Sequence, residues 1–119
     1  MPRIMLAEDD LTMVTLLKTL LDMEGYQVVA LSVDDDVFEA VRSDRPDVLL
    51  MDVHLPNVNG LDVLEQVRRD DETSDLKVVM TSGLNLELEC KNRGADDFLL
   101  KPYMPDDLLN ILKSNIKQS

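Results

Sequence analysis

The chain has 119 residues, of which 45% are hydrophobic and 30% are charged. The hydrophobic residues are enough to fill one core, and the charged residues are enough to cover its surface. We therefore expect a single folded domain over residues 1–119 and not a disordered chain. Its formal net charge of −12 disfavours contact with nucleic acid or an anionic membrane and favours a basic partner or a bound cation, with simple solubility as the alternative. One cysteine (Cys90) and one histidine (His54) exclude an intrachain disulfide and a multi-histidine metal site.

Five short apolar runs predict five β-strands, at residues 3–7, 26–32, 47–52, 77–82 and 97–101. Their apolar residues are consecutive rather than alternating, which is typical of strands that helices cover on both faces. Helical patterns separate the runs, and such alternation is typical of βα units on a parallel sheet. The predicted fold class is therefore α/β.

Four segments between and after these runs have helical spacing: 11–24, 35–43, 60–69 and 105–117. In the first, four apolar residues at three- and four-residue spacing predict the buried face: Leu11, Val14, Leu17 and Leu21. We expect Asp10 to cap the start of this helix and Gly25 to end it in a left-handed conformation. Pro105 suits the first position of the last helix.

The segment before the fifth strand breaks this pattern. Residues 84–90 read LNLELEC, with apolar residues at every second position, which is strand periodicity. A parallel sheet requires a crossover here, and that crossover is usually helical. We therefore expect a short or irregular fourth helix.

Carboxylates follow two of the predicted strands: Glu8 and Asp9 after the first, and Asp52 at the end of the third. In an open parallel sheet of order 2-1-3-4-5 these strand ends meet at the point where the order reverses, which is where ligands bind. Two carboxylates ~4 Å apart repel by roughly 4 kcal/mol at an effective dielectric of about 20, so the cluster favours a hard divalent cation such as Mg²⁺. The alternative is that Glu8 and Asp9 are a solvated helix cap.

Two further strand ends carry polar groups that suit a phosphoryl ligand. The fourth ends in Thr81 and Ser82, which offer a hydroxyl, and the fifth ends in Lys101, which offers an ammonium. Acids, a hydroxyl and a lysine at one sheet edge indicate a site for a magnesium-bound phosphoryl group.

Four pieces of the sequence resemble the receiver domain of bacterial two-component response regulators, such as the chemotaxis regulators. They are LAEDD (6–10), MDVHLPNVNG (51–60), VVMTSG (78–83) and GADDFLLKPY (94–103). The resemblance implies a flavodoxin-like (βα)5 fold with strand order 2-1-3-4-5 and phosphorylation of Asp52.

The resemblance also implies the roles of the surrounding residues. Asp9 and Asp52 would be ligands of Mg²⁺ (or Mn²⁺), with a third ligand from the backbone carbonyl of His54. Glu8 would act on the metal through a bound water, and Lys101 would pair with the phosphoryl oxygens.

Two positions match the switch residues of the family. The hydroxyl falls on Ser82, with Thr81 as the alternative, since alternation along the strand points only one of them into the site. The aromatic residue that turns inward on activation falls on Phe98, where many members carry tyrosine, and a static core ring is the alternative. The Lys101–Pro102 peptide bond would be cis, which proline permits at little cost.

Other matching positions carry weaker expectations. Gly60 could take a positive φ before the next helix. His54 and Leu84 occupy variable positions that would tune the lifetime of the phosphoryl group, Leu84 by excluding water, with ordinary loop surface as the alternative. The stretch from Ser82 to Gly94 is about three residues shorter than is common in the family, which is nearly one helical turn. This segment therefore departs from the family pattern, and the partners of other family members cannot be assigned to this chain by resemblance.

The expected function is that of a phosphoacceptor. Asp52 would take a phosphoryl group from a histidine kinase or a small phosphodonor, and the face around the fourth helix, fifth strand and fifth helix would change its partner binding. The chain would then be a signalling module and not an enzyme. The alternatives are a pseudo-receiver that is never phosphorylated, and a haloacid-dehalogenase-like phosphatase, which needs a second aspartate where His54 stands and a cap domain for which there is no room.

The expected partners follow from this function. They are a sensor histidine kinase or phosphotransfer protein, and a downstream effector or a C-terminal output domain beyond Ser119; a homodimer stays open. No direct contact with nucleic acid or membrane is expected. No apolar stretch approaches the ~20 residues of a membrane span and no signal peptide is recognisable, so we expect a cytoplasmic protein.

Overall fold

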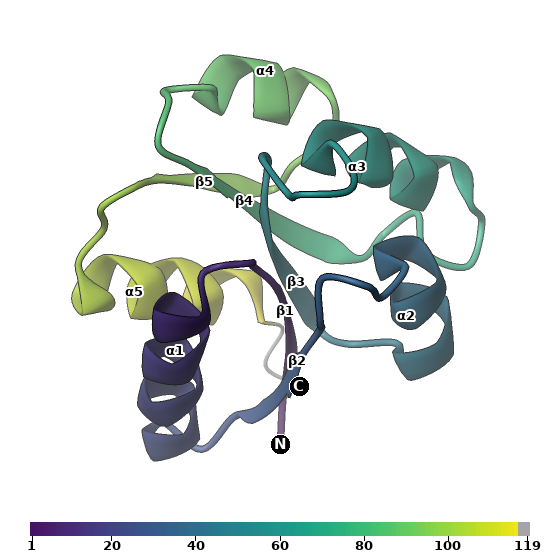
Figure 1. The fold of residues 1–119 in the computed structure, drawn as a ribbon. Helices are drawn as coiled ribbons and strands as arrows, with labels where there is room; N and C mark the ends of the chain where they lie inside the picture. Colours follow the sequence, from purple (N-terminus) through teal and green to yellow (C-terminus); the bar gives the residue numbers. More distant parts are fainter. Residues whose placement is uncertain (117–119) are drawn as a thin grey trace.

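The computed structural model describes residues 1–116, in which five strands and five helices alternate along the chain (Figure 1). The strands are β1 (Arg3–Ala7), β2 (Gln27–Ala30), β3 (Val48–Asp52), β4 (Lys77–Ser82) and β5 (Asp97–Leu100). The helices are α1 (Leu11–Met23), α2 (Val37–Asp44), α3 (Gly60–Arg69), α4 (Glu87–Asn92) and α5 (Pro105–Asn115). All neighbouring strands are parallel and lie in the order β2-β1-β3-β4-β5, which confirms the predicted flavodoxin-like sheet.

Helices cover both faces of the sheet, and each face has its own apolar core (Figure 1). Side chains of α1 and α5 pack on one face, against Ile4 and Leu6 of β1 and Leu50 of β3. Side chains of α2, α3 and α4 pack on the other face, against the alternate strand residues, such as Met5 and Met51. Because successive strand residues point to opposite faces, the consecutive apolar runs are explained by burial on both sides.

Asp10 caps the start of α1, as predicted, but the buried face of this helix differs from the predicted one. The side chain of Asp10 accepts hydrogen bonds from the backbone N–H groups of Thr12 and Met13, and Gly25 has φ of +87° after the helix ends. Leu11, however, is 78% exposed, so its assignment to the core was wrong. Leu11 begins the helix next to the site loop, and the buried stripe follows one turn later.

That stripe is formed by Leu17 and Leu21, which are buried, with Met13 and Leu20 partly buried beside them. These positions are spaced as i, i+4, i+7 and i+8, which is the pattern of one helical face.

Segment 84–90 contains the short helix expected there, since α4 has only six residues. Leu86 and Cys90, four residues apart, face the core, whereas Leu84 and Leu88 are 61% and 75% exposed. A helix sets residues four apart on one face and residues two apart on different faces. The alternating apolar residues therefore lie on two sides of this segment: Leu86 and Cys90 face the core, and Leu84 and Leu88 face solvent.

The remaining boundaries differ from the predicted ones by small amounts. α5 begins at Pro105, as predicted, and ends at Asn115. Residue 117, the last of the predicted helix, lies outside the described residues. Within residues 1–116, no helix is both long enough and apolar enough to cross a membrane.

Candidate functional site

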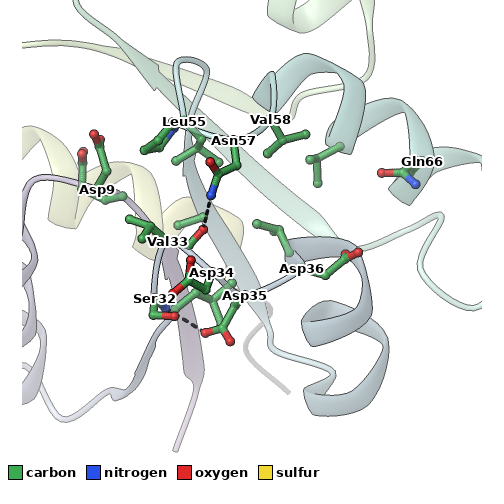
Figure 2. Close-up of a pocket in the computed structure, with 16 residues that line it drawn as sticks. Asp9, Ser32, Val33, Asp34, Asp35, Asp36, Leu55, Asn57, Val58 and Gln66 are labelled. Atoms are coloured by element: carbon green, nitrogen blue, oxygen red, sulfur yellow. Dashed lines mark hydrogen bonds between the residues drawn. The ribbon is translucent and has the colours of Figure 1, made fainter.

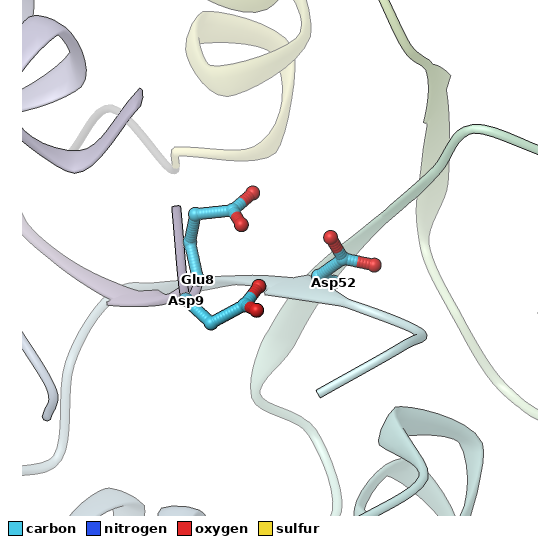
Figure 3. A group of neighbouring side chains, drawn as sticks. All are labelled: Glu8, Asp9 and Asp52. Carbon is cyan, nitrogen blue, oxygen red and sulfur yellow. The ribbon is translucent and has the colours of Figure 1, made fainter. Parts of the chain in front are cut away.

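Three carboxylates meet where the order of the strands reverses (Figure 3). Glu8 and Asp9 follow β1, and Asp52 is the last residue of β3, the strand beside β1. Each of the three offers a carboxylate oxygen, and these oxygens all lie within 4.8 Å of one another. The sequence therefore predicted the convergence of these three residues correctly.

Lys101, which follows β5, supplies the basic partner that the neighbouring sequence lacks. Its Nζ lies 2.5 Å from Oε1 of Glu8 and 2.5 Å from Oδ2 of Asp52. Burial lowers the pKa of Lys101, but the hydrogen bonds that it donates to Asp52 and Glu8, together with the negative charges of these acids, outweigh this effect and raise the pKa above its usual value. Lys101 is therefore an ammonium ion at neutral pH, and its peptide bond to Pro102 is cis, as the resemblance implied.

Backbone amides fix the two acids that contact Lys101. Oδ1 of Asp52 accepts a hydrogen bond of 2.9 Å from the N–H of His54, and Oε2 of Glu8 accepts one of 3.1 Å from the N–H of Asp10. Asp52 is only 7% exposed. Asp9 is exposed, and its carboxylate makes no hydrogen bond or ion pair with any residue of 1–116. Asp9 is thus the free carboxylate of the cluster.

The donor set of the cluster fits a hard divalent cation. Three carboxylates and one ammonium leave two formal negative charges, and all the acidic donors are oxygens. Mg²⁺ prefers oxygen ligands and is commonly bound through one or two carboxylates. Asp9, the exposed member of the cluster, is the side chain through which a cation would stay in contact with solvent.

Gly60, the first residue of α3, lies against the backbone of Asp52, and this close approach is why a glycine is needed there. A Cβ at this position would lie 2.5 Å from the carbonyl oxygen of Asp52 and 3.0 Å from Cα of Val53. Gly60 does not adopt a positive φ, so that expectation was wrong. Its own N–H donates to the carbonyl of Val53 over 2.7 Å.

Asn59, which the sequence analysis did not single out, caps α3 through a hydrogen bond of 2.8 Å from the N–H of Leu61 to its Oδ1. An Asn immediately before a helical pattern is the signal that could have identified it.

The two candidate hydroxyls are both buried at the end of β4, where Thr81 is 2% exposed and Ser82 is fully buried. Thr81 pairs with Asp52 in the register between β3 and β4. Ser82 lies one residue further along. Its Oγ accepts a hydrogen bond of 3.0 Å from the backbone N–H of Leu84, and its carbonyl accepts one of 2.8 Å from the backbone N–H of Lys101. The assignment of the switch hydroxyl to Ser82 stays a prediction, with Thr81 as its alternative.

Phe98, the second predicted switch residue, is buried, whereas the two positions expected to tune phosphoryl lifetime, His54 and Leu84, are exposed. Phe98 is 9% exposed and packs in the core on the α2, α3 and α4 face. The side chains of His54 and Leu84 are exposed on the loops after β3 and β4. Both lie on the site edge of the sheet, and their effect on phosphoryl lifetime stays a prediction.

A cavity of about 360 Å³ lies next to the acid cluster and is bordered by the loops after β1, β2 and β3 (Figure 2). Asn57 donates a hydrogen bond of 2.8 Å to the carbonyl of Val33, which ties two of these loops together. Glu8 and Asp9 line the cavity, but Asp52 and Lys101 do not. The cavity therefore adjoins the site without containing the residues that would react.

Comparisons with known proteins agree with this geometry. The family "Response regulator receiver domain" matches residues 4–113. The transcriptional regulatory protein CpxR of Klebsiella pneumoniae is 35% identical over 122 residues, covering 100% of this chain and 51% of that protein, so this chain spans about half the length of that relative. Protein PilH of Pseudomonas aeruginosa is 32% identical over 96% of this chain and 97% of its own length.

Solved structures show the same fold, and one of them holds a metal ion. The receiver domain of the sensor histidine kinase PA1611 from Pseudomonas aeruginosa is 28% identical, has a TM-score of 0.79 and covers 95% of each chain. That structure has a magnesium ion coordinated in its active-site cleft. From its sequence match, its sheet and its acid cluster, this chain belongs to the response regulator receiver domain family of two-component signalling systems.

Proposed function

We propose that Asp52 is the phosphoacceptor of this receiver domain, and that it takes a phosphoryl group from the phosphohistidine of a kinase, from a phosphotransfer protein or from a small phosphodonor. The observation that supports this most is the buried carboxylate of Asp52, held between the N–H of His54 and the ammonium of Lys101 beside two further acids. A static salt bridge would not need the two unneutralised negative charges that remain.

In the transfer, Oδ of Asp52 attacks phosphorus while the bond from phosphorus to the donor nitrogen or oxygen breaks, and the electron pair leaves with the donor. The N–H of His54 orients the carboxylate for this attack, and Lys101 balances charge on the phosphoryl oxygens. A Mg²⁺ (or Mn²⁺) held by Asp9, Asp52 and the backbone carbonyl of His54, with Glu8 acting through water, would neutralise further charge there.

Phosphorylation would change the populations of two states rather than create a new fold. Ser82 would move to donate a hydrogen bond to a phosphoryl oxygen and give up its contact with the N–H of Leu84. Phe98 is already buried, which also fits the alternative of a static core ring, so the turn of its ring on activation stays a prediction. A partner would detect this at the face formed by α4, β5 and α5.

The signal would pass to a downstream effector protein or to an output domain. The first of these relatives is about twice as long as this chain and is a transcriptional regulatory protein, which supports an output through a linked domain. PilH, which has nearly the same length as this chain, supports an output through a separate protein. The donor in both cases would be a sensor histidine kinase or a phosphotransfer protein.

The direct test is incubation with acetyl phosphate and Mg²⁺, followed by intact-mass measurement and peptide mapping after reduction with borohydride. The expected result is one phosphoryl group per chain, on Asp52, which Asp52→Asn and omission of Mg²⁺ both abolish. A pseudo-receiver would gain none although folded. Phosphate release with many turnovers from unrelated phosphate esters would instead contradict the phosphoacceptor function.

A further inference from the structure

Glu8 uses both of its carboxylate oxygens within the protein. Oε1 contacts Nζ of Lys101 at 2.5 Å, and Oε2 accepts the N–H of Asp10 at 3.1 Å. Its side chain is only 7% exposed. A carboxylate with this surrounding has little freedom to turn toward a cation.

Asp9, the next residue, has the opposite surroundings. Its side chain is exposed and has no contact with Lys101, or with any other donor, among residues 1–116. Figure 3 shows the carboxylates of Glu8 and Asp9 both on the side of Asp52, so the two acids differ in their contacts and not in their direction.

We propose that Glu8 is a positioning residue that holds the ammonium of Lys101 at the phosphoacceptor, and that its part in binding the metal is secondary. This inference rests on the proposed function, because it assigns Glu8 a role in the same reaction. It gives the two acids separate tasks: Asp9 binds the cation and Glu8 places the lysine.

The reaction itself explains why Lys101 needs a second anionic partner. Asp52 accepts from Lys101 before transfer, but its oxygens must also bind the cation and form the bond to phosphorus. Glu8 takes part in neither of these bonds, so its contact with Lys101 can persist through the transfer. Lysine has four rotatable side-chain bonds, and one permanent ionic contact restricts them.

The position of Lys101 in the sheet explains why a second contact helps to hold its side chain at Asp52. Lys101 comes from the loop after β5, which lies at the edge of the sheet two strands away from β3. The side chain must therefore reach across the edge of the sheet to meet Asp52. Glu8 follows β1, which lies on the other side of β3, and it contacts the end of the Lys101 side chain.

The test is the rate at which acetic anhydride acylates Lys101 in the full chain without metal or phosphodonor, followed by peptide mass spectrometry. Glu8→Gln removes the ionic contact, and the expected result is acylation of Lys101 at least fivefold faster than in the wild type. Asp9→Asn is the matched control, since it removes one charge from the same cluster, and it should change the rate less than twofold. Lys18, an exposed lysine on α1, provides the internal reference in each sample.

A second measurement separates positioning from metal binding. With Mg²⁺ raised to saturation for each variant, Glu8→Gln should still accept phosphate from acetyl phosphate at least tenfold more slowly than the wild type. Asp9→Asn should instead show its main defect as weaker Mg²⁺ binding, measured by calorimetry.

Three outcomes would overturn the proposal: unchanged acylation of Lys101 in Glu8→Gln, equal acceleration in Asp9→Asn, or full recovery of Glu8→Gln at saturating Mg²⁺. Because the acylation assay needs no phosphoryl transfer, its result is distinct from a failure of the wild type to become phosphorylated, which would contradict the proposed function.

Discussion

At the scale of single residues, the site depends as much on what surrounds Asp52 as on Asp52 itself. Its carboxylate is fixed by the N–H of His54 and by Lys101, and its backbone is in close contact with Gly60. The three acids and the lysine could be predicted from the sequence, because each directly follows a strong strand signal. The reason for Gly60 could not, since a close approach between two backbones leaves no local pattern.

Gly60→Ala should impair the site and destabilise the fold. The new Cβ would lie 2.5 Å from the carbonyl oxygen of Asp52, so β3 or α3 must shift, at a cost of about 1–3 kcal/mol. We expect at least tenfold slower phosphorylation from acetyl phosphate, measured by intact mass. Gly83→Ala is the matched control because a Cβ there meets no atom within 4 Å and should leave stability within about 1 kcal/mol of the wild type. Equal effects of the two variants would refute the role of close approach at Gly60.

Stability should fall at alkaline pH, in part through Tyr103. Burial raises the pKa of Tyr103 to about 12, from an ordinary value of 10.0. As the pH rises from about 10, the unfolded chain loses this proton before the folded chain does, so the free energy of unfolding should decrease between about pH 10 and pH 12. The raised pKa of Lys101 acts in the same direction at high pH.

Urea denaturation at a series of pH values measures this decrease, and absorbance at 295 nm follows the phenol. Tyr103→Phe should remove the phenol that ionises near pH 12 and make the free energy of unfolding fall less steeply over that interval. If Tyr103→Phe removed absorbance that develops near pH 10 instead of near pH 12, the phenol of Tyr103 would not be buried.

At the scale of elements, the sequence predicts which helices and strands form better than it predicts which of their side chains are buried. All five strands and the four long helices were predicted within a few residues, because their apolar patterns are local. The prediction of the buried face of α1 was partly wrong, because Leu11 is exposed. The shortness of α4 was predicted from the small number of residues between Ser82 and Gly94 and not from an apolar pattern. Which apolar residue is buried depends on where the neighbouring strand ends, and a single helix does not encode that.

Arg68, near the end of α3, shows how contacts distant in sequence join elements. Its guanidinium donates to the carbonyls of Gly94, Ser74 and Leu76 and to the carboxylate of Asp96. These bonds connect α3 with the segments that lead into β4 and β5. The sequence showed only a cation in the last turn of a helix.

Replacement of this arginine should be strongly destabilising. Arg68→Ala removes the side-chain donor of three carbonyls and one of the donors of the Asp96 carboxylate, and we expect a loss of about 2–4 kcal/mol in the free energy of unfolding, measured by urea denaturation. Arg69→Ala is the control, since Arg69 is 77% exposed and makes one pair within its helix, worth about 0.5 kcal/mol. Similar losses in both variants would contradict the importance of these contacts.

At the scale of the whole molecule, residues far apart in the sequence form one site because parallel strands end at the same edge of the sheet. Glu8 and Lys101 are separated by 93 positions, yet they are in contact. The meeting of these residues could be predicted because the predicted strand order places these strand ends together. The proposed separate tasks of Glu8 and Asp9 could not, because they depend on side-chain contacts that only the folded structure defines.

Divalent cations should stabilise the whole domain through this site. Mg²⁺ at a hundred times its dissociation constant should add about 2.7 kcal/mol to the free energy of unfolding, if the unfolded chain does not bind it. Asp9→Asn should remove most of this gain, whereas Asp22→Asn, which neutralises an exposed acid on α1, should keep it. Thermal unfolding with and without Mg²⁺ measures the difference, and a gain of equal size in both variants would point to screening of the net charge of −12 instead.

The most direct test of the central claim, that Asp52 is a phosphoacceptor in a magnesium site, is the binding of beryllofluoride, followed by fluorine NMR in the presence of Mg²⁺. We expect resonances of bound fluoride in the wild type that vanish with EDTA and in Asp52→Ala, while amide signals near Asp52 and Ser82 shift in the wild type alone. The absence of bound fluoride from a folded wild-type protein that binds Mg²⁺ would contradict this claim.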